Sequence, residues 1–315
     1  MKNYKDFYEE YIKVNGIEHY LIHYYRKSDK TIIFLHGGPA QSEAHFLYIT
    51  ENYKSCYNLI YYDQRGAGRT QIKNNTKTED ITIENLMEDL KCIIDYVRIK
   101  YKSDNIILLG HSWGTVLGIE FIKKYHNYVS AYIGMGQVVN FLKGEKTAFT
   151  HCFEIVKNSK SKKYIKKMEE MRDYPFNIDK DNIWKAVMKF RIIQVKYGLA
   201  GYHEGTLKLM NIIRKSPIFS LKDLFAYISV LKVNKNLLDY LIDFDISSYK
   251  SFKIPIFFIC GSHDWQVPTI EVKKYFETII SPEKNIFIVE NAGHLLNIEN
   301  VQDYNIILND VADRV

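Results

Sequence analysis

The segment LLGHSWGT (residues 108–115) sets a serine between two glycines, in the pattern Gly110-x-Ser112-x-Gly114. An apolar, strand-like run precedes this segment, and a helix-like run follows it. Glycines permit a turn that is too tight for side chains at the two flanking positions. Such a strained turn holds the serine hydroxyl out at the end of a strand, and the following helix directs its N-terminus at developing negative charge. We therefore interpret Ser112 as a nucleophile, with an ordinary strand-to-helix turn as the alternative.

A serine hydroxyl is a poor nucleophile unless a neighbouring base takes its proton, and the base needs a carboxylate that orients it. After a serine on such a turn, the acid and then the histidine are expected in chain order, each beyond a later strand. Asp264 follows the apolar run Ile254–Cys260, and His294 follows Ile286–Val289. The two residues therefore suit the second and third members of a triad with Ser112. The alternatives are a helix-capping role for Asp264 and a plain surface position for His294.

Acyl transfer also requires backbone N–H groups that stabilise an oxyanion. One donor is normally the amide that follows the nucleophile, which here belongs to Trp113. The other comes from the loop after an earlier strand, and the HGGPA segment (residues 36–40) occupies that place. Because glycines let a backbone approach a substrate carbonyl closely, we predict the Gly38 amide as the second donor. Its neighbour Gly37 is the alternative.

Short apolar runs alternate along the chain with longer helical patterns, which is typical of a mostly parallel sheet flanked by helices. Two earlier strands are expected on either side of Asn15-Gly16, a two-residue hairpin signal. The alternation stops near Val139 and resumes near Lys253, and the intervening segment has the pattern of successive helices. We expect an α/β core formed by residues 1–139 and 253–315, with a helical cap of residues 140–252 inserted after the sixth strand. The six other strands are expected at Thr31–His36, Leu59–Tyr62, Asn105–Gly110, Val129–Gly134, Ile254–Gly261 and Asn285–Glu290.

The composition favours a folded protein without a nucleic-acid or membrane partner. Of the 315 residues, 46% are apolar and 14% aromatic, which supports a well-buried core. The net charge of +6 does not require nucleic acid, because acidic residues follow the densest basic stretch, Lys157–Lys167, and indicate a solvated helix face. No signal-peptide pattern and no run of about 18 apolar residues is visible. With four scattered cysteines, the sequence favours a cytoplasmic protein.

No cofactor or metal is expected. The histidines and cysteines do not follow the spacing of a metal site. The Gly66-x-Gly68 pair within DQRGAGRT (residues 63–70) lacks the third glycine of a dinucleotide-binding loop. We instead expect Asp63 and Arg65 of this segment to brace the loops of the active site.

Three segments together resemble the proline iminopeptidase (prolyl aminopeptidase) group of α/β-hydrolases. HGGPA at residues 36–40 resembles the group's HGGPG loop, DQRGAGRT at residues 63–70 resembles its DQRGxGxS segment, and GHSWGT at residues 110–115 is similar to its GGSWGS turn. The resemblance covers roughly residues 15–140 and 253–315. It implies an α/β-hydrolase fold with an inserted helical cap. It also implies the catalytic residues Ser112, Asp264 and His294 and the oxyanion donors Gly38 and Trp113.

The chain departs from the group where the substrate amine is bound. The resemblance implies that carboxylates hold a free N-terminal ammonium, one from the cap and often one directly after the triad aspartate. Trp265 occupies the second position here. Glu204 is our candidate for the cap carboxylate, and a solvent-exposed turn residue is the alternative.

Two substrate classes therefore remain open for a small molecule or a short peptide. The first activity is that of an aminopeptidase that removes an N-terminal residue, such as proline, from small peptides. The second is that of a carboxylesterase or amidase acting on a small apolar acyl compound. A non-catalytic ligand-binding module is a third possibility, against which the complete triad argues.

Overall fold

The computed structural model describes residues 7–51, 55–202, 206–223 and 233–315. Within this part of the chain, eight strands form one sheet in the order β1-β2-β4-β3-β5-β6-β7-β8. The β1–β2 and β2–β4 pairs are antiparallel, and every pair from β4 to β8 is parallel. The strands are β1 (Tyr8–Val14), β2 (Ile17–Tyr24), β3 (Lys30–Leu35), β4 (Asn58–Tyr62), β5 (Asn105–His111), β6 (Ala131–Met135), β7 (Ile256–Gly261) and β8 (Lys284–Val289).

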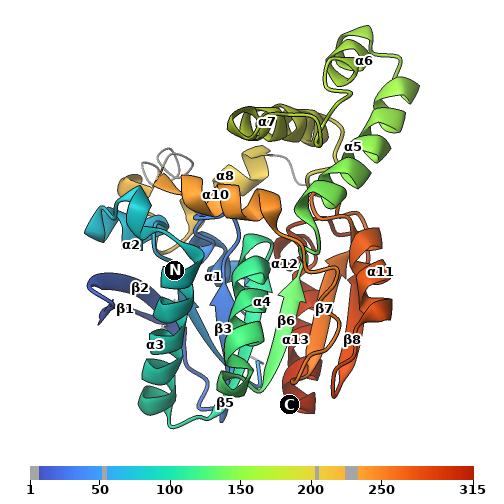
Figure 1. Ribbon diagram of the computed structural model, residues 1–315. Helices are drawn as coiled ribbons and strands as arrows, with labels where there is room; N and C mark the ends of the chain where they lie inside the picture. Colours follow the sequence, from blue (N-terminus) through green and yellow to red (C-terminus); the bar gives the residue numbers. More distant parts are fainter. Residues whose placement is uncertain (1–6, 52–54, 203–205, 224–232) are drawn as a thin grey trace.

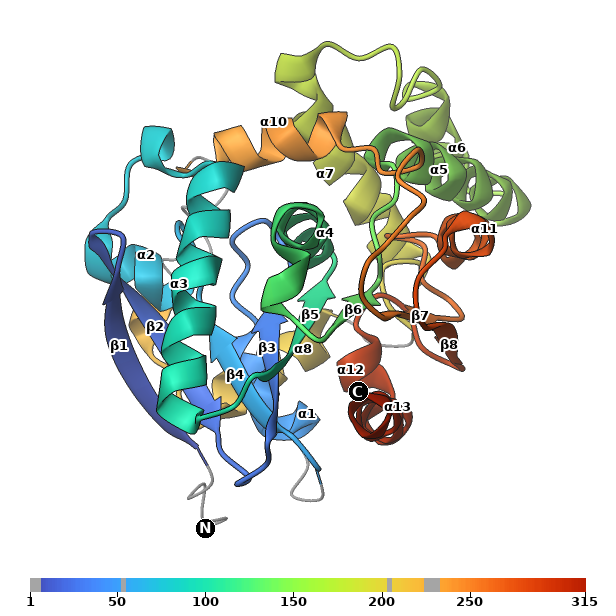
Figure 2. The same ribbon diagram turned by 60° about the horizontal axis from the view of Figure 1, so that its bottom comes forward.

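Helices cover both faces of this sheet, and Figure 2 shows α4 and α13 on opposite sides of it. Alternate residues of the strands supply the two faces: in β3, Ile33 and Leu35 belong to one apolar cluster, and Ile32 and Phe34 belong to the other. The described α-helices are α1 (Leu47–Thr50), α2 (Gly68–Asn74), α3 (Ile83–Tyr101), α4 (Trp113–Tyr125), α5 (Phe141–Asn158), α6 (Lys162–Glu169), α7 (Lys180–Lys196), α8 (Thr206–Lys215), α10 (Lys235–Asp243), α11 (Thr269–Thr278), α12 (Leu296–Glu299) and α13 (Val301–Arg314). Short 3-10 turns add Ala44–Phe46, Thr78–Asp80 and His126–Tyr128.

The arrangement confirms the predicted α/β-hydrolase architecture, and the local signals explain several boundaries. Asn15 and Gly16 both have positive φ, 47° and 83°, as a two-residue hairpin turn requires. Helix α3 begins directly after Thr82, whose side chain accepts a hydrogen bond from the Asn85 amide. Strand β7 starts at Ile256, two residues later than predicted, because Pro255 has no N–H to donate to a neighbouring strand.

After β6 the chain leaves the sheet and returns to it at β7. The helices between them include α5, α6, α7 and α10, which lie over the end of the sheet to which the arrowheads of the parallel strands point (Figure 1). Because loops that follow parallel strands open at this end, the helices face the loops that carry the predicted chemistry. None of the described helices is both long and apolar enough to span a bilayer.

A buried ion pair fixes the loop after β4 to helix α3. Arg65 donates to both carboxylate oxygens of Asp89, with nitrogen–oxygen distances of 2.8 and 2.9 Å. Asn15 of the hairpin donates to the same carboxylate at 2.9 Å. The Arg65 side chain is 7% exposed and that of Asp89 is 1% exposed, so neither charge is well solvated. The pair thus joins the hairpin, the DQR segment and α3 on one side of the sheet.

We predict that Arg65→Met lowers the free energy of unfolding by about 3–5 kcal/mol, because the Asp89 carboxylate then stays buried without its cation. Urea denaturation of the variant measures this change. The matched control is Lys124→Met, which removes the cation of an exposed pair with Glu88 and is expected to cost less than about 1 kcal/mol. Equal losses in the two variants would contradict a structural role for the buried pair.

Candidate active site

The turn between β5 and α4 holds Ser112 in a conformation that few non-glycine residues adopt. Its φ is 51° and its ψ is −116°. A Cβ atom at Gly114 would lie 2.0 Å from the carbonyl oxygen of Leu35, and one at Gly110 would lie 2.4 Å from the Gly114 carbonyl oxygen. Both contacts are far shorter than any real carbon–oxygen contact. The two glycines are therefore required, and the serine takes the strained position between them.

Asp264 and His294 come together although 30 residues separate them. Asp264 follows the end of β7, and His294 follows the end of β8. The Nδ1 atom of His294 lies 2.8 Å from Oδ2 of Asp264. Both side chains are largely buried: that of His294 is 9% exposed and that of Asp264 is 1% exposed. A carboxylate in this position orients the imidazole and stabilises the imidazolium form.

Asp264 does not cap a helix, because α11 begins at Thr269 with Pro268 at its N-cap. Its other carboxylate oxygen instead stabilises the turn that leads into α11. Oδ1 accepts hydrogen bonds from the amides of Gln266 and Val267, each at 2.9 Å. These bonds fix the plane of the carboxylate and leave Oδ2 for His294. The two roles are thus complementary.

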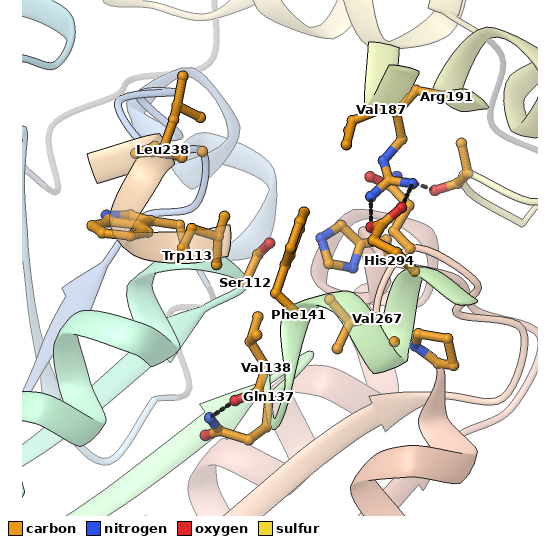
Figure 3. A pocket seen from close by; sticks show the side chains of 18 of the residues that line it. Ser112, Trp113, Gln137, Val138, Phe141, Val187, Arg191, Leu238, Val267 and His294 are labelled. Carbon is orange, nitrogen blue, oxygen red and sulfur yellow. Dashed lines mark hydrogen bonds and ion pairs between the residues drawn. The ribbon is translucent and has the colours of Figure 1, made fainter. Parts of the chain in front are cut away.

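Ser112 and His294 line the same cavity (Figure 3). Within the described residues no direct hydrogen bond joins the Ser112 hydroxyl to the His294 ring. Hydrogen bonds of this kind often form only when substrate is bound. Because Nδ1 is bonded to Asp264, Nε2 is the ring nitrogen that can act on the serine.

The loop after β3 contributes Gly38 to the same cavity. The Gly37 amide donates to Oε1 of Glu43 at 2.7 Å, so this N–H already has a partner. Gly38 has a φ of 124°, a region that glycine tolerates far better than other residues. Trp113, whose amide is the other predicted oxyanion donor, lines the cavity as well. The Glu43 contact favours Gly38 over Gly37 as the second donor.

The cavity has a volume of about 420 Å³, within the range of small-molecule sites. Its floor belongs to the sheet loops, and its roof belongs to the helices inserted between β6 and β7. Most of its wall is apolar. The apolar side chains are Pro39, Trp113, Val138, Val139, Phe141, Trp184, Val187, Met188, Val195, Ala200, Leu238, Leu241, Val267 and Pro268.

A charged pair crosses the roof of the cavity. Arg191 of α7 binds Glu145 of α5 through both of its terminal nitrogens, with Nη1 3.1 Å from Oε2. Tyr174 also donates to Oε2, and Nη1 of Arg191 donates to Gln194 at 2.7 Å. Burial alone would lower the pKa of Arg191, but the Glu145 carboxylate outweighs it and raises that pKa. The guanidinium thus stays charged and paired.

Sequence reasoning missed this pair, although a signal was present. Glu145 lies on the buried face of α5, together with Phe141, Ala148, Phe149 and Cys152. A carboxylate within the apolar stripe of a helix calls for a buried cation or donor. Its partner Arg191 lies 46 residues later, on a separate helix. No sequence pattern therefore identifies Arg191 as the partner of Glu145.

Of the two predicted substrate-binding residues, Glu204 and Trp265, the structure describes only Trp265. Glu204 lies outside the described residues. The Trp265 ring stacks on His151 of α5, with ring centroids 3.5 Å apart and planes 9° apart, and Trp265 is not among the described residues that line the cavity. Its neighbours Gln266 and Val267 do line it, because the turn that Asp264 stabilises directs successive side chains to different sides.

Comparisons with known proteins agree with the fold. The family model "Serine aminopeptidase, S33" matches residues 26–174. A probable aminopeptidase of Bacillus subtilis is 24% identical, over 92% of this chain and 89% of its own. A proline iminopeptidase of Saccharolobus solfataricus is 25% identical, over 100% of this chain and 96% of its own.

Among solved structures, a proline iminopeptidase-related protein from Thermus thermophilus superimposes with a TM-score of 0.69 at 16% identity. The match covers 98% of this chain and 97% of that protein. Fold and relatives together identify the chain as an α/β-hydrolase that is similar to the proline iminopeptidases, consistent with a serine hydrolase.

Proposed function

We propose that the chain hydrolyses acyl compounds through an acyl-enzyme on Ser112. The observation that carries this proposal is the Asp264–His294 hydrogen bond beside a cavity that Ser112 also lines. The Ser112 oxygen attacks the substrate carbonyl carbon while Nε2 of His294 takes the hydroxyl proton. Asp264 stabilises the resulting imidazolium.

The remaining steps use the same groups. The amides of Gly38 and Trp113 donate to the oxyanion of the tetrahedral intermediate. His294 then gives its proton to the leaving group as the carbonyl–leaving-group bond breaks. A water molecule attacks the acyl-enzyme and its proton passes to His294. His294 then returns this proton to the Ser112 oxygen as the bond to the acyl group breaks and the acid product leaves.

In this proposal residues 140–252 form a cap that selects the substrate, and residues 1–139 and 253–315 form the core. The described cap helices supply most of the apolar roof, whereas the sheet loops supply the reacting groups. Substrates must therefore fit a space of about 420 Å³, which suits a small acyl group with its leaving group.

An aminopeptidase-like activity on small peptides is the first candidate, and the names of the two relatives support it. This activity needs a carboxylate that binds the substrate ammonium. The described carboxylates that line the cavity are Glu145 and Glu271. Glu271 is paired with Lys143 and Lys274, at 3.1 and 3.0 Å.

A carboxylesterase or amidase activity on a small apolar acyl compound is the second candidate. The pairing of Glu145 with Arg191 favours it, because an ammonium would have to displace a bound guanidinium. The apolar wall favours it too. Glu204, outside the described residues, remains the candidate that would give the first activity a free carboxylate.

Three substrates separate these candidates: prolyl 4-nitroanilide, its N-acetyl derivative, and 4-nitrophenyl butyrate. An aminopeptidase is expected to hydrolyse the first and to lose that activity when the amine is acetylated. Turnover of the butyrate ester alone would support the second candidate and contradict the first. The measurement is kcat/KM for each substrate.

Replacing Ser112 with alanine is expected to lower kcat on any accepted substrate by a factor on the order of 10³ or more, because the nucleophile is lost. A fluorophosphonate probe is expected to label the wild-type chain and not the variant. Ser248→Ala changes an exposed serine and serves as the control, with labelling unchanged. Turnover that survives in Ser112→Ala would contradict the proposed mechanism.

Replacing Arg191 with leucine tests whether Glu145 can bind a substrate amine. The change releases Glu145, so we expect kcat/KM for prolyl 4-nitroanilide to rise on the order of tenfold relative to cyclopentanecarbonyl 4-nitroanilide, a neutral compound of similar shape. The double variant Glu145→Gln/Arg191→Leu is the control and is expected to lose this preference. An unchanged ratio in Arg191→Leu would show that Glu145 does not act on the amine.

A further inference from the structure

His111, the residue before the nucleophile, is buried with a hydrogen-bond acceptor at each ring nitrogen. Nδ1 lies 2.7 Å from Oε1 of Glu43, and Nε2 lies 3.0 Å from the backbone carbonyl oxygen of His294. The His111 side chain is 3% exposed. A neutral imidazole carries one N–H and can donate to only one acceptor, whereas the imidazolium form donates to two. The two contacts therefore require one proton more than a neutral ring and a carboxylate carry together. The raised pKa of His111 and the lowered pKa of Glu43 place that proton on the imidazole.

His36, another buried histidine, shows the opposite arrangement. Its Nδ1 lies 2.9 Å from the Gly37 carbonyl oxygen, and its Nε2 accepts a hydrogen bond from the Gln64 amide at 3.0 Å. One donor and one acceptor match a neutral ring. Burial is the main reason that the pKa of His36 is lowered. Burial acts in the same direction on His111, yet the charge and hydrogen bond of Glu43 raise the pKa of His111.

Glu43 is a suitable counter-ion. Its side chain is 7% exposed, and its Oε1 accepts hydrogen bonds from both His111 and the Gly37 amide. Burial raises the pKa of Glu43 by itself, but the charge and hydrogen bond of His111 outweigh burial and lower it. Its Oε2 atom is buried and has no hydrogen-bond partner among the described residues. A carboxylate in such a place needs a neighbouring cation.

We infer that Glu43 and His111 form a buried ion pair that positions the catalytic groups around Ser112. Glu43 accepts a hydrogen bond from the Gly37 amide and so fixes the peptide that leads into Gly38. His111 donates to the backbone carbonyl oxygen of His294 and so fixes the main chain of that residue. The pair joins the loop after β3, the last residue of β5 and the loop after β8 at the turn that holds Ser112. The functional part of this inference rests on the proposed hydrolase activity, and both residues act through others, without touching substrate.

The pair also lies beside the proposed catalytic base. The His111 and His294 ring centroids are 5.0 Å apart. The other titratable groups facing His111 are Glu43 and Asp264, both of which favour its charged form. His36, whose pKa is lowered mainly by burial, completes the set.

The pH range of the pair follows from the two pKa shifts. Because the pKa of His111 is raised, its contribution to stability is complete below the ordinary histidine pKa and is lost as the pH rises through the raised value. Because the pKa of Glu43 is lowered, its contribution is lost only as the pH falls through that lowered value. The ion pair is therefore expected near neutral pH.

The protonation state can be measured directly by long-range ¹H–¹⁵N correlation spectra of the full chain, with ¹⁵N-labelled histidine. At neutral pH we expect two protonated nitrogens on His111 and a single protonated Nδ1 on His36. His111→Gln assigns the signals. A neutral His111 ring would overturn the ion pair, and this readout does not depend on any enzyme activity.

The positioning role is tested by kinetics of His111→Gln and Glu43→Gln. Both variants are expected to lose on the order of 10² in kcat with little change in KM, as misplaced catalytic groups do. His126→Gln, on an exposed turn, is the control and should leave both quantities unchanged.

A merely structural role would lower the melting temperature of His111→Gln and leave its kcat near the wild-type value. Near wild-type kcat in both variants would overturn the positioning role. Failure of fluorophosphonate to label wild-type Ser112 would instead refute the proposed hydrolase, while the NMR result on His111 would stand.

Discussion

The site depends on one close approach, between the start of α4 and the end of β3. No side chain fits between the Gly114 backbone and the Leu35 carbonyl, since a Cβ atom would lie 2.0 Å from that oxygen. This contact places the turn between β5 and α4 directly against β3, and the residues that follow β3 form the HGG loop. Ser112, the Gly38 amide and the Trp113 amide thus lie close together because the backbone of α4 is in contact with that of β3. Side chains then refine an arrangement that the backbone already dictates.

The sequence indicated the parts of the site that depend on local chemistry. Glycines at a tight turn and an Asn-Gly hairpin each have a physical reason that acts within a few residues. Asp264 and His294 were predictable because both follow apolar strands, and parallel strands bring their carboxyl ends to one edge of the sheet. The fold class was therefore predicted correctly, with errors of only a few residues at strand ends.

Contacts between distant residues could not be predicted in the same way. Glu43 and His111 are 68 residues apart, and Glu145 and Arg191 are 46 apart, so no periodicity links either pair. The direction of the Trp265 ring was also inaccessible, because it depends on how α5 packs over the turn that follows β7. A buried charge in an apolar stripe indicates that a partner exists. Only the folded structure shows which residue it is.

The two buried histidines beside Ser112 differ in the number of acceptors that face their rings. His111 faces two acceptors, and the inferred ion pair with Glu43 gives it a proton on each ring nitrogen. His294 meets a single carboxylate oxygen through Nδ1, so in the proposed mechanism Nε2 stays available to act as a base. The His111 side chain is 3% exposed and that of His294 is 9% exposed, so both are buried and burial does not explain the difference. The number of acceptors around each ring explains it, and that number depends on Glu43 and the main chain of His294.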